Sequence, residues 1–282
     1  MDAHPTGILV VGNYCHDTLL ASDGREHHVL GGSAAYIGSV LRALAIDFRV
    51  LAKVGADFRH VADAPAAPLV IESERTCAFV DDYRSGERHE TCQARGPVIT
   101  AAEVRGLGVR AKIAIACAVG GEVPAETLEA LAQIADTVIA DAQGILRLFK
   151  PDGGVSLQPL SQSGFSQSIA RVQHLKASVD EARHLDRDVE GTLIVTDGSR
   201  GCTVSQGAAS GRTSTHVEAF DAFERDATGA GDSFLAGYAI GLLRGHDPVR
   251  AARLGAFCGA RAVEVVGVPR FSHEALAQLD SL

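Results

Sequence analysis

The sequence predicts an α/β fold in which a mostly parallel sheet is covered by helices on both faces. Residues Ile8–Gly12 form a short, continuous apolar run, which is typical of a strand buried on both sides. From residue 112 onward, strand-like and helix-like segments alternate, and this alternation indicates β–α–β units that join into a parallel sheet. After Asp226 the pattern is helical almost to the end of the chain. These three observations together favour a doubly wound sheet.

The first third of the chain begins with that apolar strand and continues into a helix. Apolar residues recur at helical spacing from Ser33 to Ala45, and Ser33 is able to cap this helix. Residues 49–54 then read as the next strand. Between residues 75 and 95 two polar, partly alternating segments flank Ser85-Gly86, which predicts a hairpin. This hairpin, together with residues 18–30, is expected to project from the sheet as a small β lid.

The remaining two thirds supply the other strands and helices. No internal repeat or low-complexity block divides them, so we expect one domain over residues 1–282 with the small lid. Residues 152–167, rich in Gly, Ser and Gln, predict a loop or a weak helix. The strands are expected at 112–119, 137–142, 172–176 and 193–196, and the helices at 125–135, 233–244, 248–265 and 272–279.

Composition excludes several classes of protein. Of 282 residues, 46% are hydrophobic, which is enough for a large core. The 26 basic and 35 acidic residues give a net charge of −9, which argues against nucleic acid or a membrane surface as a partner. No apolar run is long enough to span a membrane, and the first residues do not resemble a signal peptide. With six scattered cysteines that predict reduced thiols, these features lead us to expect a cytoplasmic protein.

The segment Asp226–Phe234, with the sequence DATGAGDSF, carries the most chemical information. Gly229, Ala230 and Gly231 precede an apolar helical pattern, so a tight turn would present free backbone N–H groups at a helix N-terminus, where anions bind. Asp232 has two interpretations on spacing alone. It is either an acidic residue that stabilises the helix N-terminus or a general base that deprotonates a hydroxyl attacking a bound phosphoryl group.

This Asp-x-x-Gly-Ala-Gly-Asp motif, with Gly31-Gly32 near the N-terminus, resembles the PfkB (ribokinase-like) family of carbohydrate kinases. The resemblance spans residues 8 to about 271. It implies a ribokinase-like doubly wound sheet, ATP as phosphoryl donor and Mg²⁺. Segments 12–17, 175–182 and 226–235 most resemble the plant members that phosphorylate myo-inositol at its 3-hydroxyl.

The resemblance also assigns roles to individual residues. It implies that Asp232 is the catalytic base and contacts the substrate, and that Gly229, Ala230 and Gly231 form the anion hole. A further set of residues falls on the family's substrate side: Asn13, Asp17, Gly31, Gly32, Asp141 and Gln143. For Asp141, Gln143 and the nearby Arg147, a solvated carboxylate and a surface ion pair are an equally good explanation.

The nucleotide side is implied by two further segments. Thr196, Gly198 and Gly201 resemble a turn that contacts nucleotide phosphate and ribose, although an Asp-Gly turn between two strands explains the same pattern. Lys176, Ser178 and Glu181 fall where the family has an element linked to phosphate and, through water, to Mg²⁺. A strand end followed by a capped helix is the rival explanation for these three residues.

Departures from the family pattern bear on the substrate. Ser178, Cys15 and Tyr36 each replace an asparagine that is usual in the family, so an ordinary ribose or fructose pocket is not expected. Tyr14 and His16, beside Asn13, are candidates to line a pocket for a ring of similar polarity and different shape, although an exposed position at a strand end explains His16 equally well.

The absence of other motifs narrows the function further. The sequence contains no P-loop, no His-Arg-Asp catalytic loop, no Gly-x-Ser-x-Gly elbow and no His-Glu-x-x-His motif. We therefore expect an ATP-dependent kinase for a small polyol, with myo-inositol as the leading substrate. The alternatives are a kinase for another sugar or nucleoside, and a kinase-like protein that binds nucleotide without turnover. A monomer or a weak homodimer is expected, because the lid offers little apolar surface.

Overall fold

The structure is a computed structural model that describes residues 4–86, 88–207 and 211–269, together with residues 271, 272, 275, 278 and 279. Its centre is an eight-stranded sheet in the order β16-β15-β14-β13-β10-β9-β1-β4. Neighbouring strands from β4 to β14 are parallel, whereas β15 pairs antiparallel with both β14 and β16. The strands of this sheet are β1 (His4–Val11), β4 (Phe48–Leu51), β9 (Val109–Ala116), β10 (Ala135–Asp141), β13 (His174–Ser178), β14 (Thr192–Thr196), β15 (Cys202–Gln206) and β16 (Thr213–Val217).

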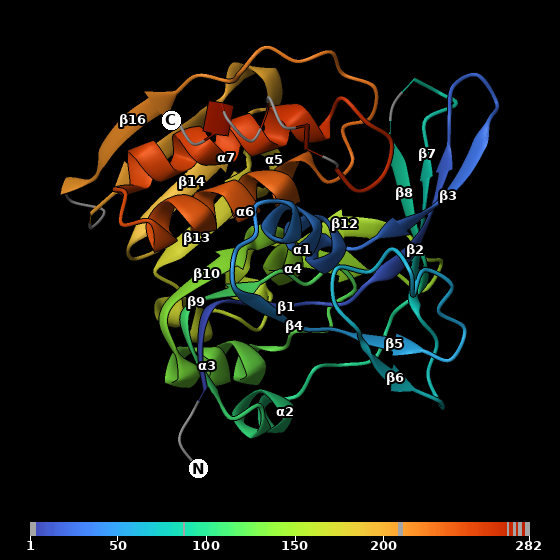
Figure 1. Cartoon of the computed structure of the whole chain (residues 1–282), viewed down its shortest axis with the longest axis horizontal. Helices are drawn as coiled ribbons and strands as arrows, with labels where there is room; N and C mark the ends of the chain where they lie inside the picture. Colours follow the sequence, from blue (N-terminus) through green and yellow to red (C-terminus); the bar gives the residue numbers. More distant parts are fainter. Residues whose placement is uncertain are drawn as a thin grey trace.

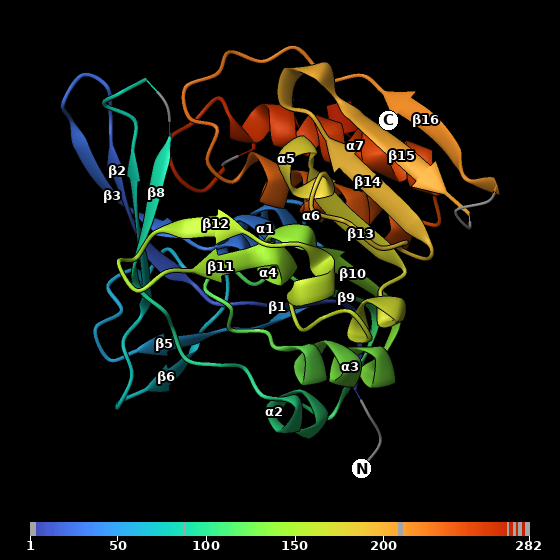
Figure 2. The ribbon, with the colours of Figure 1, turned by 180° about the vertical axis from the view of Figure 1, so that it is seen from behind.

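Helices cover both faces of this sheet, as Figures 1 and 2 show from opposite sides. Adjacent residues of β1 pack into different cores: Ile8 and Val10 join the core with α1, α6 and α7, whereas Leu9 and Val11 join the core with α2 and α3. The predicted α/β fold with a doubly wound, mostly parallel sheet is therefore confirmed. The helices are α1 (Ser33–Ala43), α2 (Ala101–Gly106), α3 (Ala125–Ile134), α4 (Ala142–Leu146), α5 (Val179–Ala182), α6 (Ala230–Leu243) and α7 (Pro248–Ala262), with 3-10 turns at Leu160–Gln162, Ser168–Arg171 and Gly198–Arg200.

A second, four-stranded sheet in the order β3-β2-β7-β8 stands at one end of the molecule (Figure 1). We call this sheet the lid; its strands are β2 (Cys15–Leu20), β3 (Glu26–Gly31), β7 (Cys77–Asp82) and β8 (His89–Ala94). It is made by the two segments that the sequence predicts to leave the main sheet. Buried and partly exposed residues alternate along β2 and β7, so one face of the lid is covered and the other is open to solvent.

Several local expectations were wrong. The strand predicted at 49–54 is split at Ala52, because β5 (Lys53–Gly55) leaves the main sheet and pairs with β6 (Leu69–Ile71). Ser33 does not cap α1; the cap position is Gly32, whose φ of 87° favours glycine. Residues 152–167 contain β12 (Val155–Leu157), which pairs with β11 (Arg147–Phe149), and a 3-10 turn.

The helix predicted at 272–279 lies largely outside the described residues. Among the helices that the structure describes, none combines the length and hydropathy that a membrane span requires.

Candidate active site

Two adjoining cavities lie where the parallel strands end. The first has a volume of about 280 Å³ and the second about 230 Å³, and both are lined by Thr196, Ala227 and Gly231. Asp141, Ser178 and Thr196 are the last residues of their strands, so this is the carboxyl edge of the sheet, where α/β proteins bind ligands. The lid forms another wall of the first cavity.

The start of α6 presents unpaired backbone N–H groups, as the motif predicts, although the N–H of Ala230 donates to the Ala227 carbonyl. Gly229 occupies the cap position with φ 75°, and a Cβ at Gly229 would lie 2.0 Å from the Tyr36 ring, so only glycine fits. Ser233 N–H donates to the Gly229 carbonyl, but within the described part of the chain no acceptor faces the N–H groups of Gly231 and Asp232. Two unpaired N–H groups at a helix N-terminus can bind a phosphate oxygen.

Asp232 points its carboxylate into the first cavity rather than onto the backbone of its own helix. Ser33, from the start of α1, lines the same cavity. Burial and the neighbouring Asp141 carboxylate raise the pKa of Asp232 to about 6, although Lys176 opposes the shift. A carboxylate with this pKa is mostly ionised at neutral pH and is a stronger base than an exposed aspartate, which suits general-base chemistry.

A buried ion pair lies next to the unpaired N–H groups of α6. Lys176 Nζ donates to Asp141 Oδ2 at 2.9 Å, and both side chains are buried. Burial lowers the pKa of Lys176, but the carboxylates of Asp141, Glu181 and Asp232 outweigh it, so the pKa is raised and the amine stays charged. A Cβ at Gly231 would lie 2.8 Å from Nζ, which puts the ammonium beside the unpaired N–H groups. The ammonium of Lys176, held in place by Asp141, thus lies beside the N–H groups that would bind a phosphate.

Ser178 and Glu181 line the same cavity and form a capping box at the start of α5. Ser178 N–H donates to Glu181 Oε2 at 2.7 Å, and Glu181 N–H donates to Ser178 Oγ at 3.2 Å. This is the capped-helix arrangement that the sequence left open, and it leaves Glu181 Oε1 without a hydrogen bond among the described residues.

Asp141 and Gln143 also line the first cavity. Asp141 Oδ1 accepts the Gln143 N–H at 3.1 Å and so caps α4, and Gln143 Nε2 donates to Ser33 Oγ at 3.4 Å. Ser33 thus contacts Gln143 and lines the cavity together with Asp232, although the sequence analysis assigned it only a cap.

The second cavity is lined mainly by small and apolar residues. Gly198 and Gly201 both adopt positive φ, and a Cβ at Gly201 would lie 2.1 Å from the Val217 carbonyl oxygen, so the turn must be tight. The remaining wall includes Ala219, Phe220, Ala222, Ala230, Phe234, Ala256, Gly259, Ala260 and Val263. A flat apolar ring such as a nucleobase matches such a lining.

The covered face of the lid carries acidic residues into the first cavity. Asp17 on β2, Asp81 on β7 and Glu90 on β8 all line it. Burial and the nearby Asp81 carboxylate raise the pKa of Asp17 to about 8. Asp17 Oδ1 is buried and has no hydrogen-bond partner among the described residues, so it is available to accept a hydrogen bond from a bound hydroxyl.

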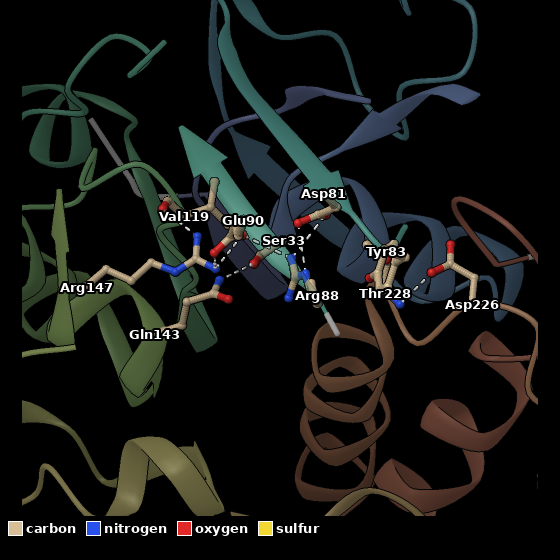
Figure 3. Close-up of polar contacts among 10 residues, drawn as sticks. All are labelled: Ser33, Asp81, Tyr83, Arg88, Glu90, Val119, Gln143, Arg147, Asp226 and Thr228. Carbon is tan, nitrogen blue, oxygen red and sulfur yellow. Dashed lines mark hydrogen bonds and ion pairs between the residues drawn. The ribbon is translucent and has the colours of Figure 1, made fainter. Parts of the chain in front are cut away.

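Arginine side chains neutralise the other two lid carboxylates (Figure 3). Arg88 donates to Asp81 from Nε at 2.8 Å and to Glu90 from Nη2 at 3.0 Å. Arg147, from β11, donates from Nη2 to both oxygens of Glu90 at 2.8 Å. Asp81, Arg88 and Glu90 were missed by the sequence analysis. The signal that could have found Asp81 is its position on the buried phase of the alternating strand β7.

Two predicted substrate residues do not line either cavity. The Asn13 side chain is buried and occupied: its amide donates to the Pro97 carbonyl at 2.8 Å and its oxygen accepts Lys53 N–H at 2.8 Å. Gly31 lies behind Asp17, where a Cβ would overlap the carboxylate.

Tyr14 and His16 also face elsewhere. Tyr14 donates to the Ala66 carbonyl, and His16 accepts the Arg59 N–H while its ring stacks on Phe58. The other predicted site residues line one or both cavities: Asp17, Gly32, Asp141, Gln143, Lys176, Ser178, Glu181, Thr196, Gly198, Gly201, Gly229, Ala230, Gly231 and Asp232.

Comparisons with known proteins agree with this arrangement. Residues 122–274 match the pfkB family of carbohydrate kinases. The chain is 35% identical over 276 residues to a protein of Arabidopsis thaliana named inositol 3-kinase, a match that covers 94% of this chain and 76% of the relative. A protein of Zea mays with the same name is 37% identical, with 93% and 73% covered.

Solved structures share the fold at much lower identity. A pyrophosphate-dependent kinase of the ribokinase family, complexed with a pyrophosphate analogue and myo-inositol, superposes with a TM-score of 0.76 at 16% identity and covers 98% of this chain and all of its own. The nucleoside kinase of Burkholderia thailandensis, in complex with inosine, gives a TM-score of 0.76 at 20% identity, with 98% and 97% covered.

Proposed function

Because the chain belongs to the pfkB family of carbohydrate kinases, we propose that it transfers the terminal phosphoryl group of ATP to the 3-hydroxyl of myo-inositol. One observation carries the proposal most directly. The half-buried Asp232 lines the same cavity as Gly231, whose N–H is unpaired, and as Asp17 of the lid, whose Oδ1 has no hydrogen-bond partner among the described residues.

The acceptor follows from the relatives and from the lining of the first cavity. The relatives that are 35–38% identical over most of the chain carry the name inositol 3-kinase. A hydroxyl-rich ring both donates and accepts hydrogen bonds, and the first cavity offers carboxylate acceptors on Asp17 and Asp141 and donors on Arg88 and Gln143. An uncharged acceptor suits this cavity, because its acidic side chains outnumber its basic ones.

The donor follows from the second cavity. Pyrophosphate serves as donor for the structural neighbour, but it has no base and would leave the apolar cavity between α7 and the 198–201 turn unused. ATP would place its base there and its phosphates toward Gly231 and Lys176.

In this mechanism Asp232 takes the proton from the attacking hydroxyl. The N–H groups of Gly231 and Asp232 and the ammonium of Lys176 stabilise the negative charge on the transferred group, which is where most of the rate acceleration arises in phosphoryl transfer. General-base assistance of this kind contributes roughly 10²- to 10⁴-fold.

Mg²⁺ accompanies the nucleotide rather than occupying a protein cage. Among the described residues no group of three acidic, histidine or cysteine side chains could hold a metal ion. Glu181 fits an indirect role, because its Oε1 is unpaired beside Ser178 and can accept a hydrogen bond from water bound to the ion. Bound there, Mg²⁺ neutralises phosphate charge.

We further expect a cytoplasmic monomer or weak homodimer. All six cysteines are free thiols, as a reducing compartment requires, and size-exclusion chromatography at two concentrations tests the oligomeric state.

A coupled assay of ADP release tests the function. The purified chain is given ATP, Mg²⁺ and one acceptor at a time from a panel of inositols, hexoses, ribose and nucleosides. Turnover that is highest with myo-inositol supports the proposal. Higher turnover with a nucleoside or an aldo-sugar would identify that compound as the acceptor instead of myo-inositol. ATP binding without ADP release in the presence of any acceptor would indicate a non-catalytic protein.

A further inference from the structure

The lid brings three carboxylates together on its covered face. In the pairing of β7 with β8, Asp81 lies directly opposite Glu90, and Asp17 on β2 lies opposite Phe79, two residues from Asp81. Like charges directly opposite each other destabilise a sheet unless a cation bridges them. Arg88 is that cation, because its guanidinium bonds both Asp81 and Glu90.

Arg88 and Arg147, the two arginines that bind the lid carboxylates, differ in how many of their N–H donors remain unpaired. Arg147 is buried: Nη1 donates to the Val119 carbonyl, Nη2 to Glu90, and its guanidinium packs on the Phe79 ring. Arg88 keeps 43% of its side chain exposed and lines the first cavity. Its Nη1 has no hydrogen bond to any residue that the structure describes, so at least two N–H donors remain unused.

A free donor and a free acceptor therefore belong to two residues that line the same cavity, Arg88 just before β8 and Asp17 on β2, with β7 between them. The acceptor is Asp17 Oδ1, and the positive charge of Arg88 lies near enough to lower the pKa of Asp17 against the effect of burial. Adjacent hydroxyls on a ring offer the complementary pattern, since one can donate while its neighbour accepts. Glu90 and Arg147 hold Arg88 in place by fixing the opposite side of its guanidinium.

We propose that Arg88 is a specificity-determining residue, which donates from Nη1 to a hydroxyl of the acceptor adjacent to the hydroxyl that Asp17 accepts. The lid then recognises a vicinal diol that is not the site of phosphorylation. This inference rests on the proposed function, because it concerns the acceptor that the kinase uses.

The test is a series of mono-deoxy analogues of myo-inositol, each lacking one hydroxyl, assayed with the parent enzyme and with Arg88→Gln. In the parent, removal of the hydroxyl that Arg88 binds is expected to lower kcat/KM about 10- to 100-fold, as for other charged hydrogen bonds. In Arg88→Gln the penalty for that same analogue should fall to within about twofold, while the KM for ATP is unchanged. A role limited to folding of the lid would weaken all acceptors alike.

Arg84→Gln is the matched control. Arg84 belongs to the same hairpin and pairs with Asp82, but it does not line either cavity, so its deoxy penalties should equal those of the parent. Because Arg88→Gln leaves the buried Asp81 unpaired, the double variant Asp81→Asn/Arg88→Gln removes both charges and should show the same loss of the penalty.

The inference is overturned if every deoxy penalty is the same in the parent and in both Arg88 variants, or if Arg84→Gln abolishes the same penalty. Assays of the parent enzyme alone test the proposed function. If the parent phosphorylates a different polyol, the proposed substrate is wrong, and the deoxy series of that polyol then tests the prediction for Arg88.

Discussion

Asp17→Asn is expected to stabilise the ligand-free protein while weakening acceptor binding. Asp17 is buried, its Oδ1 has no partner, and its pKa is raised from 3.8 to about 8 by burial first and by Asp81 second. Ionising it in the folded state therefore costs free energy that the unfolded chain does not lose, and asparagine keeps the shape without the charge.

The size of the effect depends on pH. Below pH 3.8 Asp17 does not reduce the stability of the parent, because it is protonated in both the folded and the unfolded state. As pH rises toward 8, Asp17 loses its proton in the unfolded state but keeps it in the folded state, so the free energy of unfolding of the parent falls. The difference between Asp17→Asn and the parent is on the order of 2 kcal/mol at pH 5, 4 kcal/mol at pH 7 and 5 kcal/mol at pH 8.

Urea unfolding without ligand at these three pH values measures the difference. Asp23→Asn is the control, because Asp23 is an exposed lid residue whose pKa is lowered by hydrogen bonds from Arg25; its variant should show no gain that grows with pH. The reasoning is refuted if Asp17→Asn is no more stable than the parent at pH 8, or if its advantage does not increase with pH. Above about pH 8, where Asp17 of the parent is ionised, the same variant should raise the KM for the acceptor about 10- to 100-fold, since it loses a charged hydrogen bond.

Three further predictions concern the phosphate-binding turn. Gly229→Ala should lower the free energy of unfolding by more than about 2 kcal/mol and abolish ATP turnover, because the new Cβ meets the Tyr36 ring. Gly245 has a similar φ and open space around it, so Gly245→Ala should lower the free energy of unfolding by only about 1 kcal/mol. Chemical denaturation compares the two variants. Tyr83→Phe removes the hydrogen bond from the lid tip to Thr228 and should reduce kcat/KM about 2- to 10-fold with the melting temperature nearly unchanged, so an unaltered kcat/KM would count against a lid contact in catalysis. At saturating substrates kcat should rise with pH and level off above about pH 6 as Asp232 ionises, and a profile that falls over this range would exclude it as the base.

The fold was predictable where the pattern is local. Apolar runs such as Ile8–Val11 identify strands buried on both faces, and the structure divides that run between two cores as the pattern requires. The split at Ala52 was not predictable, since residues 49–54 have the composition of one strand. The chain turns there because Lys53 N–H bonds Asn13 and the Lys53 ammonium reaches the Val98 carbonyl and Glu103, contacts made with residues far away in the sequence.

The candidate site divides in the same way. The candidate anion site and Asp232 lie within one short motif, so sequence spacing alone points to them. Asp81, Arg88 and Glu90 come from the lid hairpin, and only the pairing of its strands shows that they face the cavity. Asn13 illustrates the opposite case: the side chain of a polar residue after a strand can hydrogen-bond buried backbone groups, and sequence spacing does not distinguish this from a ligand contact.

The most direct test of the account compares the parent with Asp232→Asn in the presence of ATP, Mg²⁺ and myo-inositol. ADP release gives the rate, and chiral chromatography of the product distinguishes the 3-phosphate from its mirror image, the 1-phosphate. The account predicts that the parent forms the 3-phosphate and that Asp232→Asn lowers kcat roughly 10²- to 10⁴-fold while the dissociation constant for ATP changes by less than about threefold. No ADP release from the parent with myo-inositol, or near-normal turnover by Asp232→Asn, would contradict it.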